Sequence, residues 1–391
     1  MKNPLRKTIS EREIELPDIE IGKFLKIAVE DKSIISLGPG EPDYTPPNHI
    51  LNAAKKSISK KMTHYSPVAG RKELREAIAK KLKKENKVSV NPDQVIVTCG
   101  SNEAVLLSMI ACIDPGEQVL IPDPGFLSYI PTVELLNGQA ISVKTTLQNN
   151  FQVTTEEIKK HLKNPKKVRA IIINTPNNPT GTVYSKKCLE EIADIAVEHD
   201  LMIVSDEAYE KLIYKGKHIS MASLKGMEDY TLTLQSFSKS YGMAGFRVGY
   251  AAGPQKIIDA MKKLHILSTI SASTTSQVAA TAALKGSQSF MKKILKDYVK
   301  RKTFVCKRLT EMGHFKHNGP EGAFYIFPKY DFKMKSKDLA YWFIKNAKVA
   351  VMPGAEFGRY GEGFIRISYA TDFNLIKKAL NRLEKSVKKI K

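Results

Sequence analysis

The chain has 391 residues, of which 42% are hydrophobic and 26% charged, a balance typical of a soluble globular protein. At about 150 residues per domain, this length predicts two domains rather than one. The formal net charge of +22 raises the question of nucleic acid or an anionic membrane. However, many lysines recur at helical spacing with acidic residues between them, which favours solvated helix faces over such partners.

The first 45 residues precede the repeating strand and helix pattern and end in the turn-rich sequence LGPGEPDYTPP. They lack the apolar core of a signal peptide, and no stretch approaches the about 20 apolar residues that a membrane helix needs. We therefore expect a cytoplasmic protein with no membrane partner. Residues 1–45 are expected to pack with a smaller domain, and the segment IEIGKFLKIA is either a lid or an ordinary packed helix.

Between residues 46 and 288, short β-rich runs alternate with helical patterns. The runs lie at residues 94–98, 118–122, 169–174, 201–205 and 230–236. Several are apolar throughout (VIVT, VLIP, AIIIN, LMIVS), which is typical of parallel strands buried on both faces. Residues 46–288 are therefore predicted to form a large α/β domain, with a ligand crevice at the carboxyl ends of the strands.

After residue 288 the pattern changes to a long lysine-rich helix, the segment GAFYIFP, a helix near residues 336–347 and the segment FIRISYA. Mixed helix and strand of this kind predicts a smaller α+β domain over residues 289–391. The four cysteines of the chain show no CxxC pair, so neither a metal site nor a disulfide framework is predicted.

Lys239 follows a predicted strand in the sequence SFSKSYGMAGFRVGY, with Ser236 and Ser238 before it and Arg247 after it. A buried lysine loses its proton easily and can form a Schiff base with an aldehyde. The two hydroxyls and the guanidinium suit a phosphate. Because most lysines are simply solvated, Lys239 becomes a candidate only through these neighbours.

A second phosphate-binding element is predicted where the strand VIVT is followed by the turn CGSN and a helix. Ser101 and Asn102 begin this helix, and its free backbone N–H groups and dipole favour an anion. The plainer interpretation is a helix cap, and the turn is a site candidate only together with Arg247.

Three other strand ends carry groups that suit an aromatic cofactor. Asp206 ends an apolar strand, where an unpaired carboxylate is costly, so we expect either a cationic partner such as a protonated pyridine nitrogen or an N-cap role. Tyr209 and Asn178, the latter in the turn NTPNNPTG, are candidates to contact a ring oxygen. Phe126 could stack on the ring or belong to the core.

Taken in order, NNPTG, SDEAY, SFSKSYGMAGFRVGY and FIRISYA resemble the class I aminotransferases of the aspartate-aminotransferase fold over nearly the whole chain. The resemblance implies a mainly parallel seven-stranded sheet plus a smaller α+β domain, and pyridoxal 5′-phosphate as cofactor. It also implies transamination between an L-α-amino acid and a 2-oxo acid such as 2-oxoglutarate. The segments GSNEAVLL and GEGFIRISYAT are similar to archaeal aromatic aminotransferases, so an aspartate, aromatic or broad donor range is expected.

The same resemblance assigns a role to each candidate residue. Lys239 would carry the cofactor as a Schiff base and then move the α-proton of the substrate. The cofactor-binding residues would be Ser101, Asn102, Phe126, Asn178, Asp206, Tyr209, Ser236, Ser238 and Arg247. The substrate-binding residues would be Gly38, Asn178 and Arg366. Tyr65 would reach the phosphate of the neighbouring subunit, which implies a homodimer with shared active sites.

Two alternative functions stay open at this point. A lyase, either a carbon–sulfur β-lyase or an aminocyclopropane-carboxylate synthase, would use the same lysine, aspartate and arginine. A transcriptional regulator with an aminotransferase-like domain would need a helix-turn-helix module before it. Only about 35 residues precede the first family-like segment, fewer than the about 50 that a domain usually needs, so no nucleic-acid partner is expected.

Overall fold

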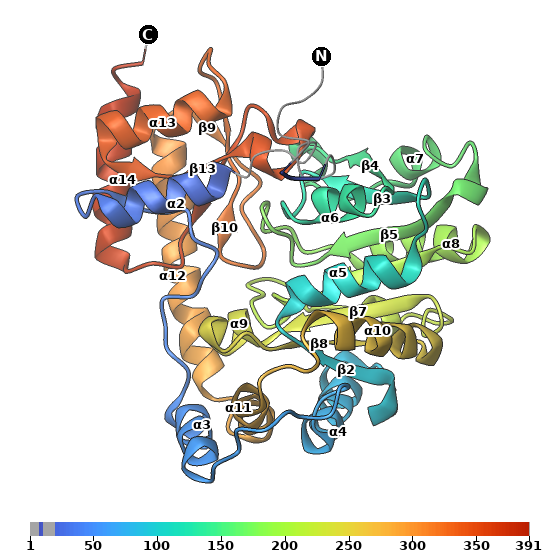
Figure 1. Ribbon diagram of the computed structural model, residues 1–391. Helices are drawn as coiled ribbons and strands as arrows, with labels where there is room; N and C mark the ends of the chain where they lie inside the picture. Colours follow the sequence, from blue (N-terminus) through green and yellow to red (C-terminus); the bar gives the residue numbers. More distant parts are fainter. Residues whose placement is uncertain (1–7, 11–19, 391) are drawn as a thin grey trace.

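The computed structural model describes residues 8–10 and 20–390, and their helices and strands gather in two bodies (Figure 1). The larger body contains a seven-stranded sheet in the order β2-β8-β7-β6-β5-β3-β4. Its strands are β2 (Val95–Thr98), β3 (Gln118–Asp123), β4 (Gln139–Lys144), β5 (Val168–Asn174), β6 (Met202–Asp206), β7 (Thr231–Ser236) and β8 (Gly249–Ala252).

All neighbouring strands of this sheet pair in parallel except β8, which runs antiparallel to both β2 and β7. The predicted α/β fold with a mainly parallel seven-stranded sheet is therefore confirmed. The reversal of β8 matters for the site. It brings Gly249, at the start of β8, beside Thr98 and Ser236, which end β2 and β7.

Helices cover both faces of the sheet. On one face, α5 (Ser101–Cys112) and α10 (Gln255–Ser268) pack on apolar strand residues, and on the other α4 (Lys72–Lys81), α8 (Lys186–Glu198) and α11 (Thr274–Lys285) do the same. Successive side chains of a strand point to opposite faces of the sheet. Because both faces are covered by helices, the side chains on both are apolar, which explains the continuous apolar runs of the sequence. The larger body also contains α3 (Asn48–Ser59), α6 (Tyr129–Leu135), α7 (Thr155–Lys159) and α9 (Phe237–Ser240).

The smaller body is built from both ends of the described chain. Its helices are α2 (Glu20–Glu30), α13 (Ser336–Ala347), α14 (Phe373–Val387) and the long α12 (Phe290–Glu311), which extends toward the larger body (Figure 1). A three-stranded antiparallel sheet runs in the order β10 (Tyr325–Ile326), β14 (Ile365–Ser368), β13 (Met352–Pro353). The smaller body also contains two separate two-stranded sheets, β1 (Ile35–Ser36) with β12 (Val349–Ala350) and β9 (Phe315–Lys316) with β11 (Lys329–Tyr330).

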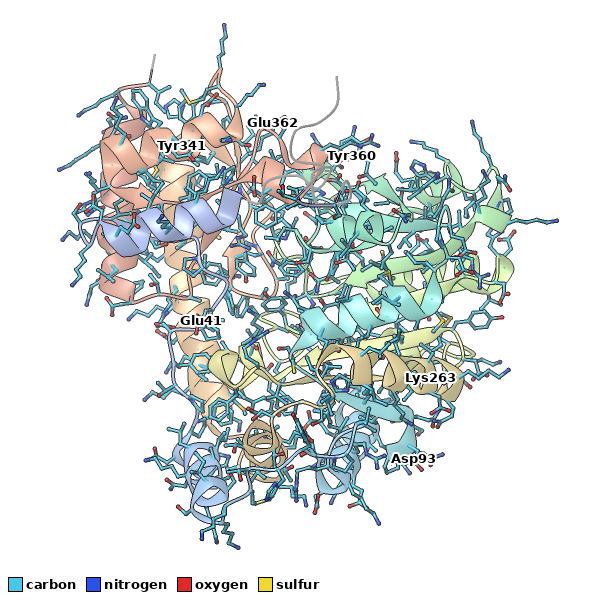
Figure 2. All side chains as sticks on the ribbon, viewed as in Figure 1. Glu41, Asp93, Lys263, Tyr341, Tyr360 and Glu362 are labelled. Atoms are coloured by element: carbon cyan, nitrogen blue, oxygen red, sulfur yellow. The ribbon has the colours of Figure 1, made fainter. Side chains whose placement is uncertain are left out.

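Helix α2 contains most of the segment IEIGKFLKIA, whose first residue lies outside the described residues. Phe24 of this helix is fully buried, and its ring centroid lies 4.7 Å from that of Tyr341 on α13, which is labelled in Figure 2. This packing agrees with the interpretation of an ordinary packed helix. Whether the segment moves as a lid stays a prediction.

The two bodies are also joined directly beside the carboxyl edge of the sheet. Asp123, at the end of β3, is buried and accepts hydrogen bonds from the backbone N–H groups of Arg359 and Tyr360, both at 3.1 Å. Tyr360, labelled in Figure 2, lies where the smaller body meets the larger one. Across residues 8–10 and 20–390, no helix combines the length and apolar character needed to cross a membrane.

Candidate active site

A cavity of about 210 Å³ lies at the carboxyl edge of the central sheet and is closed on one side by the smaller body. Most of the residues predicted to bind a cofactor or substrate line it. They are Ser101, Asn102, Phe126, Asn178, Asp206, Tyr209, Ser236, Ser238, Lys239, Arg247 and Arg366. The topology explains this convergence, because β5, β6 and β7 are parallel neighbours and end at the same edge.

Lys239 lies on the short helix α9 directly after β7, and its Nζ donates a hydrogen bond to the carbonyl oxygen of Gly40. The Tyr44 hydroxyl donates to the carbonyl oxygen of Lys239 and so ties the lysine backbone to the turn before α3. Burial, helped by the positive charge of Arg366, lowers the pKa of the Lys239 amine to about 8. An amine with such a pKa is a far better nucleophile near neutral pH than an exposed lysine.

Asp206 ends β6 and is buried at the edge of the cavity. Its carboxylate accepts hydrogen bonds from the Tyr129 hydroxyl at 2.8 Å and from the Ala208 N–H at 3.1 Å. The predicted N-cap role is wrong, because the residues directly after Asp206 form a turn and not a helix, and the second bond is a local contact within this turn. Burial raises the pKa of this carboxyl group despite both bonds, so a cation bound beside it would relieve an electrostatic cost.

Arg366, on β14 of the smaller body, is only 2% exposed. Its Nη1 donates to Asn178 Oδ1 at 2.9 Å, and its Nη2 donates to the carbonyl oxygen of Gly38. Tyr325 and Phe357 place their ring centroids 4.5 and 4.7 Å from its Cζ. Among the described residues, the buried Nε has no hydrogen-bond partner, and such an unsatisfied charged donor suits a carboxylate.

The turn before α5 and the end of β7 form a polar end of the cavity. Gly100 is the N-cap residue of α5 and has a φ of 88°. As a glycine it has no side chain that could accept a hydrogen bond from the first backbone N–H groups of the helix. A Cβ at Gly100 would lie 2.8 Å from Arg247 Nη2, so glycine lets the guanidinium approach the turn. Arg247 precedes β8, whose antiparallel direction carries it to this edge. Ser236 Oγ accepts from the Ser238 N–H at 3.1 Å beside it.

Two predicted site residues do not line the cavity. The Gly38 carbonyl instead accepts from Arg366, and a Cβ at Gly38 would lie 2.3 Å from the Met352 Cε, so a side chain there would require the methionine to move. Tyr65 is 79% exposed on the loop between α3 and α4. An exposed position is compatible with the predicted contact to a second subunit, which stays a prediction.

Sequence reasoning missed several residues that shape the cavity: Asn174, Tyr129, Tyr325 and Gly40. Asn174 Nδ2 donates to the Asp206 carbonyl at 2.9 Å, and its Oδ1 accepts from the Asn178 N–H at 2.8 Å. The Tyr325 hydroxyl lies 2.8 Å from that of Tyr209. A sequence signal existed for Asn174, which ends β5 as Asp206 ends β6. The tyrosines gave none, because their partners lie far away in the sequence.

Glu207 follows Asp206 but belongs to a separate buried network. Its carboxylate lies 2.8 Å from His218 Nε2 and accepts from the Ser220 hydroxyl at 2.7 Å. Glu210 is nearby and is paired with the ammonium group of Lys81. Ligand atoms of Glu207, Glu210 and His218 lie within 4.8 Å of one another, as in a metal site, but Lys81 already provides a cation there. We therefore regard this cluster as an ion-paired support for the end of β6.

Comparisons with known proteins agree with this geometry. A family model described as aminotransferase class I and II matches residues 32–383. The chain is 45% identical to the aromatic-amino-acid aminotransferase 2 of Thermococcus litoralis, over 95% of this chain and 96% of that protein. It is also 45% identical to the aspartate aminotransferase of Pyrococcus abyssi, with the same coverage.

Solved structures give the same result. The aspartate aminotransferase from Thermus thermophilus with maleate superimposes with a TM-score of 0.92 at 35% identity, covering 97% of this chain and 99% of that one. The aromatic aminotransferase from Pyrococcus horikoshii gives a TM-score of 0.87 at 43% identity, covering 93% and 98%.

Proposed function

The chain belongs to the class I and II aminotransferases, and on that premise we propose that its cavity binds pyridoxal 5′-phosphate through Lys239. It is an aminotransferase, which exchanges the amino group of an amino acid for the oxo group of a 2-oxo acid. The observation that carries the proposed site is the convergence of Lys239, Asp206 and Arg366 on one cavity. These residues supply a nucleophilic amine, a buried anion and a buried cation with an unsatisfied donor.

The residues of the cavity fit this cofactor at both of its ends. Asp206 is a buried carboxylate with a raised pKa, and a protonated pyridine nitrogen is a cation that would stabilise its ionised form. At the polar end, Arg247, the two serines of β7 and α9, and the N-terminus of α5 suit a phosphate. When bound, the cofactor supplies an aldehyde for covalent attachment and a ring that withdraws electrons from the substrate α-carbon.

The protein side chains then divide the remaining tasks. Arg366 binds the substrate α-carboxylate, and its Nε is the donor that has no other partner among the described residues. Asn178, whose Oδ1 is held by Arg366, uses its amide nitrogen toward a ring oxygen, together with the Tyr209 hydroxyl. Phe126, which also lines the cavity, would pack on the ring. Lys239, with its lowered pKa, would take the proton from the substrate α-carbon.

A second cavity of about 200 Å³, which shares Phe126 and Leu127 with the first, supports a proposal for the donor range. Its walls are mostly apolar, including Ile121 and Ile130, and its charged lining residues are Arg359 and Glu356. Apolar walls suit an aromatic side chain, whereas the guanidinium suits the carboxylate of aspartate. We therefore propose that both donor classes react, with 2-oxoglutarate as acceptor. Relatives carrying each name agree with this proposal.

We also propose that the enzyme is a homodimer in which Tyr65 contacts the cofactor phosphate of the partner subunit. The exposed position of this side chain supports the proposal. We further propose three regions with boundaries near residues 45 and 288, so that residues 1–45 and 289–391 form the smaller domain around the large one. A cytoplasmic location stays a prediction.

The test is a spectrum of the purified protein loaded with pyridoxal 5′-phosphate and mixed in turn with aspartate, phenylalanine, tyrosine and a cysteine conjugate. We expect the absorption band of the Lys239-bound cofactor to disappear with the first three donors and to return with 2-oxoglutarate. Lys239→Ala should show no such band. Release of pyruvate from the conjugate without any acceptor would instead favour a lyase.

A further inference from the structure

Glu103 lies close to the polar end of the first cavity and accepts hydrogen bonds from two segments, the turn before α5 and the end of α10. It is the third residue of α5, and its carboxylate accepts from the Cys99 N–H at 2.6 Å, inside the turn that precedes this helix. The same carboxylate accepts from the hydroxyls of Ser268 at 2.8 Å and Thr269 at 2.9 Å, at the end of α10. Glu103 therefore fixes the turn that presents Ser101 and Asn102 to the cavity.

His265, on α10, is fully buried beside Glu103. Its Nε2 lies 3.4 Å from Glu103 Oε2, and its Nδ1 lies 3.0 Å from the carbonyl oxygen of Val68. The buried Nε2 has no hydrogen-bond partner among the described residues, so its contact with the Glu103 carboxylate is an ion-pair contact. Nδ1 faces a carbonyl oxygen and therefore carries the proton that it donates, and a neutral ring would turn the lone pair of Nε2 toward the carboxylate. The geometry thus favours an imidazolium that donates to Val68 and is ion-paired with Glu103.

The electrostatics of the pair agree with this geometry. Burial opposes the charge on His265, but the interactions with Cys99 and Glu103 outweigh it and raise the pKa of the imidazole to about 9. Burial likewise opposes the charge on Glu103, but the interaction with His265 and the hydrogen bond from the Cys99 N–H lower the pKa of the carboxyl group to about 2. Both groups are therefore charged across the neutral range.

Val68 belongs to the segment that presents Tyr65. In this segment the carbonyl oxygen of His64 accepts from the Thr274 hydroxyl at 2.7 Å, and the Ser66 hydroxyl lies 2.7 Å from the same oxygen atom of Thr274. The residues on both sides of Tyr65 are thus tied to α11, His64 through its backbone and Ser66 through its side chain, while His265 holds the backbone at Val68. The exposed Tyr65 side chain projects from a segment that is fixed at several points.

We propose that Glu103 and His265 form a positioning pair that joins the phosphate-binding turn of one active site to the Tyr65 segment, which serves the other active site of the dimer. The inference rests on the proposed function, because it assigns the turn to the cofactor phosphate and Tyr65 to the partner subunit. Neither residue of the pair lines the cavity. They act through Ser101 on one side and through Val68 on the other.

The first part of this proposal, that the pair positions the phosphate-binding turn, is tested by comparing how tightly the protein binds the cofactor with and without its phosphate. Glu103→Gln and His265→Gln dimers, stripped of cofactor, are titrated with pyridoxal 5′-phosphate and, separately, with pyridoxal. We expect the Kd of the phosphorylated compound to rise about tenfold, as for the loss of one charge-assisted hydrogen bond, and the Kd of pyridoxal to stay within about twofold. Equal changes for both compounds, or no change, would overturn the proposal.

Three controls separate positioning from general destabilisation. Ser268→Ala removes only one donor to Glu103 and should show the same selective loss at smaller size, even if a glutamine variant folds poorly. Ser185→Ala removes the N-cap of α8, where the Ser185 hydroxyl accepts from the Cys188 N–H at 3.2 Å, and should leave both constants unchanged. If the wild type binds neither compound, the proposed function fails, and the pair is not the cause.

A double-mutant cycle tests the second part. Tyr65→Phe and His265→Gln are made separately and together, and the Kd of pyridoxal 5′-phosphate is measured for each dimer. If His265 positions the Tyr65 segment, the two changes remove a shared interaction, and their joint effect should be smaller than the product of the single effects. A joint effect equal to that product would remove the Tyr65 segment from the proposal.

Discussion

Arg366 and Asn178 lie on different bodies of the molecule, and the Nη1 of the arginine donates to the Oδ1 of the asparagine at 2.9 Å. This bond orients both side chains toward the same cavity. It also means that the smaller body contributes a cation to a site whose other groups come mainly from the ends of the large sheet. If Arg366 binds the substrate carboxylate as we propose, the position of one body relative to the other decides how that carboxylate is held.

Arg366→Lys should lower kcat/KM for every donor by about a hundredfold, because an ammonium group cannot reproduce the fork of a guanidinium and about 3 kcal/mol of bidentate binding is lost. The effect should appear mainly in KM. Steady-state kinetics with aspartate and phenylalanine check this, with Arg382→Lys as a control, since Arg382 donates to the Ser33 and Lys348 carbonyl oxygens elsewhere. Unchanged kcat/KM would remove Arg366 from the carboxylate site.

Arg359→Met should separate the two donor classes. Arg359 lines the second cavity, whose other lining residues are apolar except for Glu356. We expect kcat/KM for aspartate to fall about tenfold, through loss of one charge-assisted contact, and that for phenylalanine to stay equal or rise. Parallel kinetics with the two donors measure the ratio directly. A similar fall for both donors would show that Arg359 does not recognise the side chain of aspartate.

The pKa of Lys239, lowered from 10.5 to about 8 by burial, sets a pH dependence for capture of the cofactor. Only the neutral amine attacks an aldehyde, so the capture rate should rise about tenfold per pH unit below 8 and level off above it. Stopped-flow absorbance of the cofactor-free enzyme follows this rise. A simple lysine derivative should keep rising until about pH 10.4, the ordinary lysine value, and the same late plateau in the enzyme would contradict a lowered pKa.

Tyr129→Phe should weaken the hold of Asp206 on a cationic ring, because the carboxylate loses a donor at 2.8 Å and its pKa rises further. We expect kcat to fall about tenfold, which corresponds to one hydrogen bond of about 1.4 kcal/mol to a charged group. Tyr298→Phe is a matched control, because the buried hydroxyl of Tyr298 has no hydrogen-bond partner among the described residues. If both variants behave alike, Tyr129 has no role in the site.

The sequence was informative where local chemistry dictates structure. The central strands were predictable because burial on both faces leaves continuous apolar runs, as in β5 and β6. By contrast, β4 is partly exposed, and β8 has the sequence GYAA, without the large aliphatic residues of the other strands, so neither gave such a run. Both strands were expected only through the family resemblance, which implied seven strands.

The site shows the same division. Lys239, Asp206 and Asn178 sit in recognisable turns directly after strands, and parallel pairing brings those turns together. Residues that act through side-chain bonds to distant partners left no local pattern. Tyr129 meets Asp206 across 77 positions of the chain, and Tyr325 meets Tyr209 across 116. Only the folded chain reveals these contacts, and the pairing of Glu103 with His265 belongs to the same class.

The stability of the enzyme should depend on pH through this last pair. The pKa of His265 is raised from 6.5 to about 9, so its contribution is fully present below about pH 6.5 and is lost as the pH rises through 9. The pKa of Glu103 is lowered from 4.5 to about 2, so its contribution is present above about pH 4.5 and is lost as the pH falls through 2.

The wild type should therefore exceed His265→Gln in thermal midpoint by a constant margin between about pH 5 and 6.5. This margin should shrink steadily as the pH rises toward 10, because the wild-type imidazole becomes neutral while glutamine does not titrate. Thermal melts of the two proteins at equal concentration and fixed ionic strength measure this margin. Cys99 also contacts His265, so Cys99→Ser is melted in parallel as a control for the loss of a neighbour of the imidazole. A margin that is independent of pH would mean that His265 is neutral in the folded enzyme and bridges only one of its two acceptors.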